Sequence, residues 1–376
     1  INLAFLAWSA GRAADGLAAV DRLLAIDPAS KDGRLLRASL LEAAGRLDES
    51  IAAYRAMIAV DARDAEAHWG LSRALLLTGV FTEGWREYEW RWRRGEMKEA
   101  RPRFDAPIWD GAPLDGKAIL LYAEQGAGDT FQFIRYVPLV KALGAGRVIV
   151  ACNRAWHALL RSVAGIDDLV ATGDALPAFD CHAALLSLPL AFGTTLDTIP
   201  APTCYLAADP ARVAAWRARM AHLPRPRVGL CWQGNPDFKA DQRRSPPLAT
   251  LAPFVHGARA AFVSVHKGAG ESQLATSGIA DRMTVLEGID DFADTAAIME
   301  NLDLVVTSDT AVAHLAGALG RPTWTMLAFA PDWRWLLDRA DTPWYPTMRL
   351  FRQDAPGDWA GVVRRLRETF SATAWT

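Results

Sequence analysis

The chain has 376 residues, of which 51% are hydrophobic and 22% are charged, and its formal net charge is −2. This length predicts two or three domains, and the near-neutral charge gives no support for nucleic-acid binding. No apolar segment is long enough to span a membrane, and the first residues lack a signal-peptide pattern. The four cysteines form no Cys-x-x-Cys pair, so neither a zinc site nor a disulfide framework is indicated and a cytoplasmic location is expected.

The first quarter of the chain is repetitive. Similar segments begin at Gly11, Gly45 and Gly79, 34 residues apart each time, with helical patterns between them. This period resembles the tetratricopeptide repeat, so residues 1–95 are expected to form an α-solenoid. Ile1 falls inside a helical pattern, and about three repeats are usual for a stable solenoid, so the array is expected either to continue upstream or to pack on the next domain. Such repeats form a concave groove for a protein segment, although a scaffold that only packs on its neighbour is the alternative.

Aromatic residues gather at the end of this region. Trp85, Tyr88 and Trp92 share one helix face, and arginines surround them. A stacking platform for nucleic acid would use such residues. The common face instead favours a seal between the repeats and the following domain.

Behind the repeats, apolar strands alternate with helices, which predicts parallel sheets covered on both faces. The expected fold is an α-solenoid followed by two Rossmann-like domains that face a cleft. The expected boundaries are a linker at 96–116, an N-terminal acceptor domain at 117–209, a connector at 210–226, a C-terminal donor domain at 227–355, and a final helix at 356–376 that packs back on the N-terminal half.

The first candidate site is a loop between the first predicted strand and the helix after it. Its glycines would allow close approach of a substrate, but it matches neither the dinucleotide fingerprint nor the P-loop. From the residues alone, Asp129 is equally well a helix cap or a functional carboxylate. The candidate loop residues are Glu124, Gln125, Gly126, Gly128, Asp129 and Thr130.

Two further candidate sites follow strands of the second α/β half. In one, a buried strand leads into a helix start that can hold a diphosphate through backbone N–H groups, although capping alone would explain its polar residues. In the other, basic residues in a polar loop suit a diphosphate leaving group, although a solvated charge cluster is the alternative. The candidate donor-binding residues are Gln233, Gly234, Asn235, Lys239, Arg244, Ser308, Asp309, Thr310 and His314, with Arg243 as a further basic candidate.

Together, the segments "EQGAGDTFQFIRY", "SDTAVAHLAGALGRPTW" and "APDWRWLLDRADTPWYPTMRLFRQ" resemble GT-B nucleotide-sugar glycosyltransferases of the heptosyltransferase-related branch. The whole layout is similar to protein O-glycosyltransferases and to bacterial flagellin glycosyltransferases with tetratricopeptide repeats. The resemblance implies that Asp129 is the general base. It also implies that Asp309, Thr310 and His314 bind the donor diphosphate and sugar, and that Arg244 contacts phosphate.

The mechanism that this resemblance implies is inverting sugar transfer from a nucleotide-sugar to a hydroxyl group, with the nucleotide-sugar as a substrate and no cofactor. No Asp-x-Asp pair stands in a suitable loop, so no metal is expected. The expected acceptor is a protein Ser or Thr, with flagellin as a candidate. A lipopolysaccharide or other surface-glycan acceptor and a catalytically inactive repeat adaptor are the alternatives. The residues do not choose among UDP-, GDP-, ADP- and CMP-linked donors.

Overall fold

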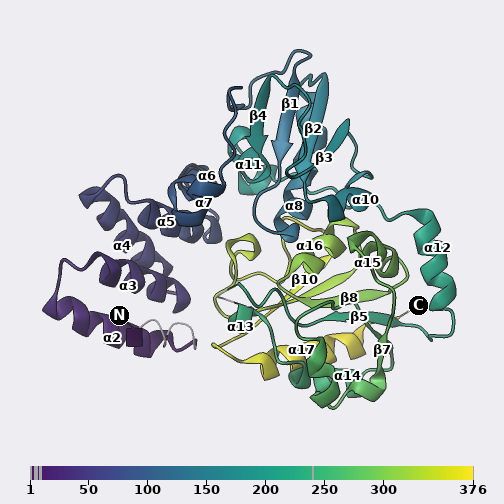
Figure 1. Ribbon diagram of the computed structural model, residues 1–376. Helices are drawn as coiled ribbons and strands as arrows, with labels where there is room; N and C mark the ends of the chain where they lie inside the picture. Colours follow the sequence, from purple (N-terminus) through teal and green to yellow (C-terminus); the bar gives the residue numbers. More distant parts are fainter. Residues whose placement is uncertain (1, 4–6, 8–10, 239–240, 376) are drawn as a thin grey trace.

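The structure is a computed structural model that describes residues 2–3, 7, 11–238 and 241–375. The chain forms a helical region and two α/β domains, each built on its own parallel sheet (Figure 1). The helical region lies beside both α/β domains, and the first sheet lies above the second in this view.

The helical region is a stack in which each helix packs on the next. Gly11, Gly45 and Gly79 all have positive φ angles, of 73°, 76° and 82°. Because L-residues with a side chain rarely adopt such angles, glycine recurs at each of these turns. The positive φ angles at these turns thus explain why glycine recurs every 34 residues. The helices are α2 (Ala13–Ile26), α3 (Lys31–Ala43), α4 (Leu47–Val60), α5 (Ala65–Leu77) and α6 (Phe81–Tyr88), followed by η1 (Glu89–Arg93) and α7 (Gly95–Ala100).

The first sheet has the strand order β3-β2-β1-β4, and all of its neighbouring strands run parallel. The helix expected after the first strand is divided in the structure, because Pro138 lacks the N–H group that a continuous helix needs. Strand β4 is short, since the chain turns into a helix after Ala184. The elements are β1 (Ala118–Tyr122), α8 (Ala127–Phe133), η2 (Ile134–Tyr136), α9 (Val137–Ala142), β2 (Arg147–Cys152), η3 (Arg154–Trp156), α10 (His157–Leu160), β3 (Asp168–Ala171), β4 (Cys181–Ala184), η4 (Leu185–Ser187), α11 (Leu188–Ala191) and η5 (Leu196–Thr198).

The second sheet has the order β10-β9-β8-β5-β6-β7 and is also parallel throughout. Its central strands follow the predicted pattern, whereas the short edge strands β7 and β10 were not predicted. The strands are β5 (Arg227–Cys231), β6 (Ala261–Ser264), β7 (Met283–Val285), β8 (Leu304–Ser308), β9 (Thr323–Leu327) and β10 (Met348–Arg352). The helices are α12 (Pro210–Arg219), α13 (Asp241–Arg244), η6 (Leu248–Leu251), α14 (Ala252–Gly257), η7 (Glu271–Thr276), η8 (Ala280–Arg282), α15 (Phe292–Met299), α16 (Ala311–Ala318), η9 (Trp333–Trp335) and α17 (Trp359–Ala372).

The final helix, α17, packs on α14, η6 and β10 of the second α/β domain. Its apolar face, which includes Val362, Leu366 and Phe370, is buried in the same cluster as Phe254 and Phe262. The expectation that this helix packs back on the N-terminal half is therefore wrong. The apolar stripe of α17 predicted that the helix is buried, but a stripe does not specify which neighbour buries it.

The end of the helical region is part of the core of the first α/β domain. Trp85 and Tyr88 are almost completely buried, in one cluster with Ile119 and Phe133. The indole Nε1 of Trp85 donates a hydrogen bond to the carbonyl oxygen of Thr194 at 3.0 Å. The predicted seal between the aromatic face and the following domain is confirmed. Among the described helices, none is both long and apolar enough to cross a bilayer.

Candidate functional site

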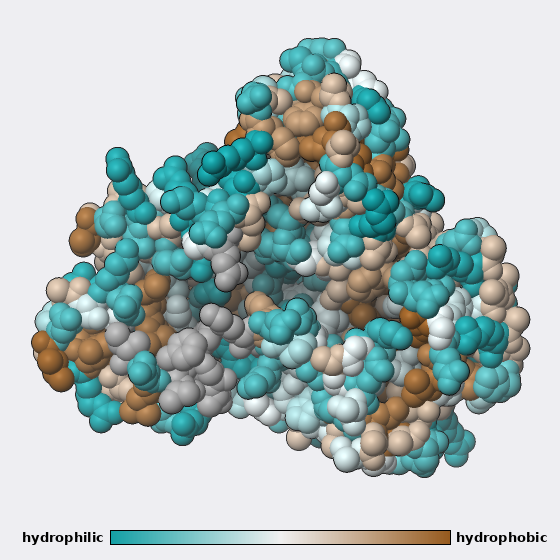
Figure 2. Space-filling view, viewed as in Figure 1, coloured by the Kyte–Doolittle hydropathy of each residue, from teal (hydrophilic) through white to brown (hydrophobic). Residues whose placement is uncertain are grey.

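A cavity of about 900 Å³ lies where the helical region and the two α/β domains meet. The molecular surface is hollowed at this junction (Figure 2). Loops at the carboxyl ends of β1, β5 and β8 all contribute to its lining, which is the edge at which parallel sheets bind ligands. The volume is within the range of ligand-binding cavities.

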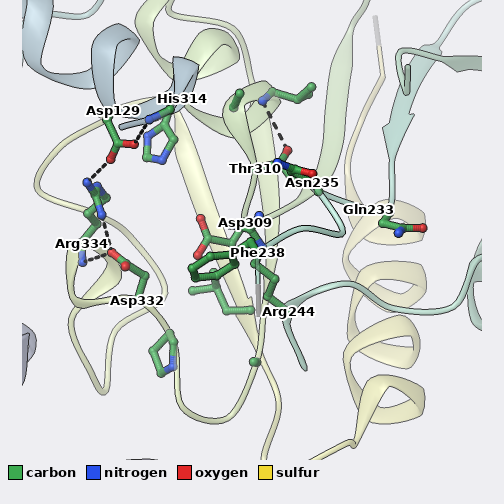
Figure 3. A pocket seen from close by; sticks show the side chains of 18 of the residues that line it. Asp129, Gln233, Asn235, Phe238, Arg244, Asp309, Thr310, His314, Asp332 and Arg334 are labelled. Atoms are coloured by element: carbon green, nitrogen blue, oxygen red, sulfur yellow. Dashed lines mark hydrogen bonds and ion pairs between the residues drawn. The ribbon is translucent and has the colours of Figure 1, made fainter. Parts of the chain in front are cut away.

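Asp129 lines this cavity from the third position of α8. Its Oδ2 atom accepts a hydrogen bond from the backbone N–H of Gly126 at 2.9 Å, and its other oxygen is ion-paired with Arg334 (Figure 3). The side chain retains 20% of its exposure. Each carboxylate oxygen has more than one lone pair, so Asp129 can accept a further hydrogen bond. The carboxylate is thus both a helix cap and a cavity group.

Gly128 brings the first α/β domain into contact with the second. Helix α8 packs on α16, and a Cβ atom added at Gly128 would lie 2.8 Å from Cδ2 of His314 and 3.3 Å from Cα of Ala311. A separation of 2.8 Å is too short for a carbon contact, so a side chain at this position would push the two helices apart. The glycine was expected to make room for a substrate, but in the structure it makes room for α16.

The predicted donor segment lies at the start of α16. Thr310 caps the helix by accepting a hydrogen bond from the backbone N–H of Val312 at 3.3 Å. Asp309, the residue before it, is buried, and this burial together with the charge of Asp332 raises its pKa to about 6. Both residues line the cavity. The unpaired N–H groups of a helix start can bind an anion.

His314 lies one turn further into α16 and also lines the cavity. Its Nδ1 atom is 2.8 Å from the hydroxyl oxygen of Tyr345, and its ring stacks on Trp335 with centroids 5.4 Å apart. Burial, together with the positive charges of nearby arginines, holds the pKa of His314 well below its usual range. The imidazole is therefore neutral at physiological pH.

The loop after β5, which was predicted to bind the donor, also reaches the cavity. Gln233, Gly234, Asn235 and Arg244 all line it, whereas Lys239 lies outside the described residues. The Nε atom of Arg244 donates to Oδ1 of Asp241 at 3.1 Å. A Cβ atom added at Gly234 would lie 2.4 Å from Nη2 of Arg244, so this glycine lets the guanidinium pass close to the loop backbone.

Three residues that the sequence assigned to the site lie elsewhere. Glu124 is turned toward Arg91, with its Oε1 atom 2.7 Å from Nη2, and does not line the main cavity. Thr130 is fully buried and its hydroxyl donates to the carbonyl oxygen of Gly126 at 3.3 Å. Ser308 is also fully buried, and its hydroxyl has no partner among the described residues. Adjacent positions of a loop or strand point in different directions, so proximity in sequence did not place these side chains in the cavity.

Arg334, whose guanidinium group contacts Asp129, is not among the predicted site residues. Its guanidinium group is buried and binds three acceptors, because Nε donates to Gln132 at 2.5 Å and Nη1 donates to Asp332 at 2.9 Å in addition to the Asp129 contact. Arg334 and Asp332 stand in the segment "APDWRW". The alternation of charged and aromatic residues there was a usable signal for a cavity wall.

The helical region forms a further wall of the same cavity, through Ser39, Glu42 and Ala43 of α3 and Arg73 and Leu77 of α5. This contribution was not predicted, since repeat periodicity identifies helices but not the surface they face. Within the described part of the chain, no group of three or more His, Cys, Asp and Glu side chains is arranged to hold a metal ion.

Residues 263–335 match the model of the family described as glycosyltransferase family 9 (heptosyltransferase). A curated relative, Protein FlbA of Caulobacter vibrioides, is 32% identical over 317 residues, which are 78% of this chain and 52% of that protein. The chain thus spans about half the length of this relative.

Among solved structures, a glycosyltransferase family 9 protein from Veillonella parvula matches with a TM-score of 0.50 and 10% identity, over 65% of this chain and 88% of that one. The E. coli ADP-heptose lps heptosyltransferase II matches with a TM-score of 0.49 and 13% identity, over 68% of this chain and 99% of that one. The family match includes β8, the start of α16 and Arg334. The second α/β domain is therefore similar to glycosyltransferase family 9 (heptosyltransferase) over residues 263–335, and the α/β part of the chain resembles the Veillonella parvula structure in fold.

Proposed function

We propose that this protein is an inverting, metal-independent glycosyltransferase that moves a sugar from a nucleotide-sugar to a hydroxyl group on a protein. The observation that carries the proposal is the contact between the Asp129 loop and the start of α16 in one cavity, where α16 belongs to the segment similar to glycosyltransferase family 9. A carboxylate thereby lies beside a helix start that suits a diphosphate. The nucleotide-sugar is a substrate, and the proposal includes no cofactor.

Asp129 is the proposed general base. In this step the acceptor oxygen forms a bond to the anomeric carbon, and its proton passes to the Asp129 carboxylate. The bond between the anomeric carbon and the donor phosphate breaks, and the nucleotide diphosphate leaves with the electron pair. Attack from the face opposite the leaving group inverts the anomeric configuration.

The leaving diphosphate is the proposed ligand of the α16 start and of Arg244. Thr310 supplies a hydroxyl group beside the helix N–H groups, and Arg244 supplies a positive charge on the same side of the cavity. Charge developing on the diphosphate is stabilised by such fixed dipoles and cations. His314 is neutral and can donate or accept a hydrogen bond to the sugar without adding charge. Gln233, Gly234 and Asn235 are further donor contacts in this proposal.

The acceptor assignment rests on the helical region. Its helices are proposed tetratricopeptide repeats, and they line the cavity beside Asp129 and Arg334. A repeat surface that reaches the reaction site can present a protein segment directly to the base. A cytoplasmic location is part of this proposal, and flagellin is the acceptor that the sequence resemblance suggests.

A surface-glycan acceptor is the second candidate, because the matching family model is described as heptosyltransferase. The two candidates are separated by offering the purified enzyme a bacterial protein extract and a lipopolysaccharide-core oligosaccharide with the same radiolabelled donor. Label on protein supports the leading proposal. Label on the oligosaccharide alone would replace it with the second.

The donor and the enzymatic activity are tested together. Thermal unfolding is measured with UDP, GDP, ADP and CMP, because a ligand stabilises the folded state by RT ln(1 + [L]/Kd). Hydrolysis of the corresponding nucleotide-sugar is then measured for the wild-type protein and for Asp129→Asn. One nucleotide should raise Tm clearly above the others. The absence of any shift and of any hydrolysis would exclude a transferase and favour an inactive adaptor.

A further inference from the structure

A charged pair on the helical region lies in the cavity wall. The Nη2 atom of Arg73, on α5, is 2.9 Å from Oε2 of Glu42, on α3. The side chains keep 35% and 17% of their exposure, and both line the cavity. Arg73 has a further buried donor, Nε, without a partner among the described residues. The pair therefore links two helices at the cavity wall and remains partly exposed.

A second arginine approaches this pair from the other side of the cavity. Arg243 belongs to α13 of the second α/β domain, beside which the helical region lies in Figure 1, and it lines the same cavity. Burial, and then the positive charge of Arg73, lower the pKa of Arg243, whereas Glu42 raises it. Glu42, which pairs with Arg73, thus also lies near enough to Arg243 to affect its pKa. We call Glu42, Arg73 and Arg243 the arginine wall.

The arginine wall is close to the proposed reaction site. Helix α5 packs on η9, which contains Arg334, and Arg334 is ion-paired with Asp129. Arg73 is also near enough to Asp332 for that carboxylate to raise its pKa, after the larger effect of Glu42 and against burial. A peptide that places a hydroxyl group at Asp129 and follows the helical region would therefore cross this wall.

We propose that the arginine wall determines acceptor specificity by binding a carboxylate side chain that flanks the modified Ser or Thr of the acceptor. This inference rests on the proposed protein acceptor, and it specifies that acidic residues flank the modified Ser or Thr. Guanidinium groups bind carboxylates through paired, charge-assisted hydrogen bonds, and the excess positive charge on this wall favours an acidic over a neutral or basic segment.

The test uses two fluorescein-labelled peptides of about ten residues, each with one central Ser flanked on both sides by two Glu or by two Gln residues. Their Kd values for the full chain are measured by fluorescence anisotropy. The wild-type protein should bind the Glu peptide at least about tenfold more tightly, which corresponds to about 1.4 kcal/mol. In Arg73→Gln this ratio should fall to about one, because the charge-assisted contact is lost.

Arg55→Gln is the matched control. Arg55 also pairs with a glutamate of the helical region, Glu83, at 2.8 Å, but neither residue lines the cavity. This variant should keep the wild-type ratio. A purely structural role for Arg73 would weaken both peptides equally and leave the ratio unchanged. Equal binding of both peptides by the wild-type protein, or a ratio that survives in Arg73→Gln, overturns the proposal.

Failure of this inference is distinguishable from failure of the proposed function. Hydrolysis of the nucleotide-sugar by the wild-type protein depends on Asp129 and the proposed donor side, and it requires no acceptor peptide. If the wild-type protein hydrolyses the nucleotide-sugar but does not discriminate between the peptides, the proposed transferase function is retained and the proposed role of the arginine wall is rejected. If the wild-type protein does not hydrolyse any nucleotide-sugar, the proposed transferase function is rejected, regardless of how the peptides bind.

Discussion

Asp129 and Arg334 are 205 residues apart in the sequence, and their side chains form an ion pair between the two α/β domains. The same guanidinium group also donates to Gln132, on the helix that carries Asp129, and to Asp332. Removing Arg334 would leave the Asp129 carboxylate without its paired cation. The position of the proposed base therefore depends on the relative placement of the domains.

Replacing Asp129 by Asn should abolish most of the transfer activity. The amide oxygen can still accept the hydrogen bond from Gly126, but the side chain can no longer take a proton. We expect the rate to fall by about a hundred- to ten-thousandfold, the usual contribution of a general base. Steady-state transfer assays check this, with nucleotide binding as the control for the donor site. A loss of less than about tenfold would exclude Asp129 as the base.

Gly128→Ala should separate the Asp129 loop from α16. The added Cβ would lie 2.8 Å from His314 Cδ2, so the helices must move, at an expected cost of about 1–3 kcal/mol in the free energy of unfolding. A displacement of this kind can lower activity by about a hundredfold. Urea unfolding and transfer assays measure the two effects.

Gly126→Ala is the control for that substitution, because its Cβ would meet only the Asp129 Oδ2 atom, at 3.3 Å. Gly126 has a φ of −90°, which alanine adopts without strain. We expect this variant to retain most of its stability. If both alanine variants have the same stability and activity, the contact between α8 and α16 is not the reason that residue 128 is a glycine.

Glu124 should make stability depend on pH. Burial raises its pKa to about 7 from 4.5, and the charge and hydrogen bond of Arg91 only partly offset this effect. A carboxyl group with a raised pKa binds its proton more tightly in the folded state. Its stabilising contribution is therefore complete below about pH 4.5 and is lost as the pH rises to about 7.

The measurement is urea unfolding of the wild-type protein and of Glu124→Gln from about pH 5 to about pH 8. The free energy of unfolding of the wild type, relative to that of the variant, should fall by on the order of 2–3 kcal/mol across this range. The variant has no titrating group at position 124, so its free energy of unfolding reports the pH dependence that all other groups contribute. A difference that stays constant with pH would show that Glu124 does not titrate in this range.

Deletion of residues 1–95 should prevent folding rather than only remove an acceptor surface. The deletion takes away Trp85 and Tyr88 from the core and removes Arg91, the ion-pair partner of Glu124. Truncation of a single buried Trp side chain typically costs about 3–5 kcal/mol, a large part of the stability of a typical domain. Circular dichroism during thermal unfolding reports the outcome. A truncated chain that unfolds cooperatively would show that the α/β domains fold independently.

The sequence predicted the fold well where the pattern was long and local. The glycines at 11, 45 and 79 predicted regularly spaced helix ends, and the central strands β5 and β8 followed from continuous apolar runs. The edge strands β7 and β10 were missed. Met348–Arg352 mixes charged and apolar residues because an edge strand has only one neighbour to bury it.

The candidate site was predicted in part. Asp129, Asp309 and Thr310 follow predicted strands, where helix capping was the alternative, and the family resemblance assigned them to the site. All three line the cavity. Glu124 had the same sequence context and points elsewhere, because Arg91 from another part of the chain binds it. A contact between residues that are 33 positions apart leaves no pattern in the sequence around either residue.

The sequence by itself determined the helical repeat, the two α/β halves and the segments at the carboxyl ends of their strands, because periodicity and chain order are local properties. Tertiary structure alone decided that Arg334 meets Asp129, that Gly128 admits α16, and that Arg73 and Arg243 share one cavity wall. The physical reason is that ion pairs and close packing depend on the distance between residues that are far apart in the sequence. The chain brings such residues together only when folding buries the hydrophobic faces of separate elements against one another.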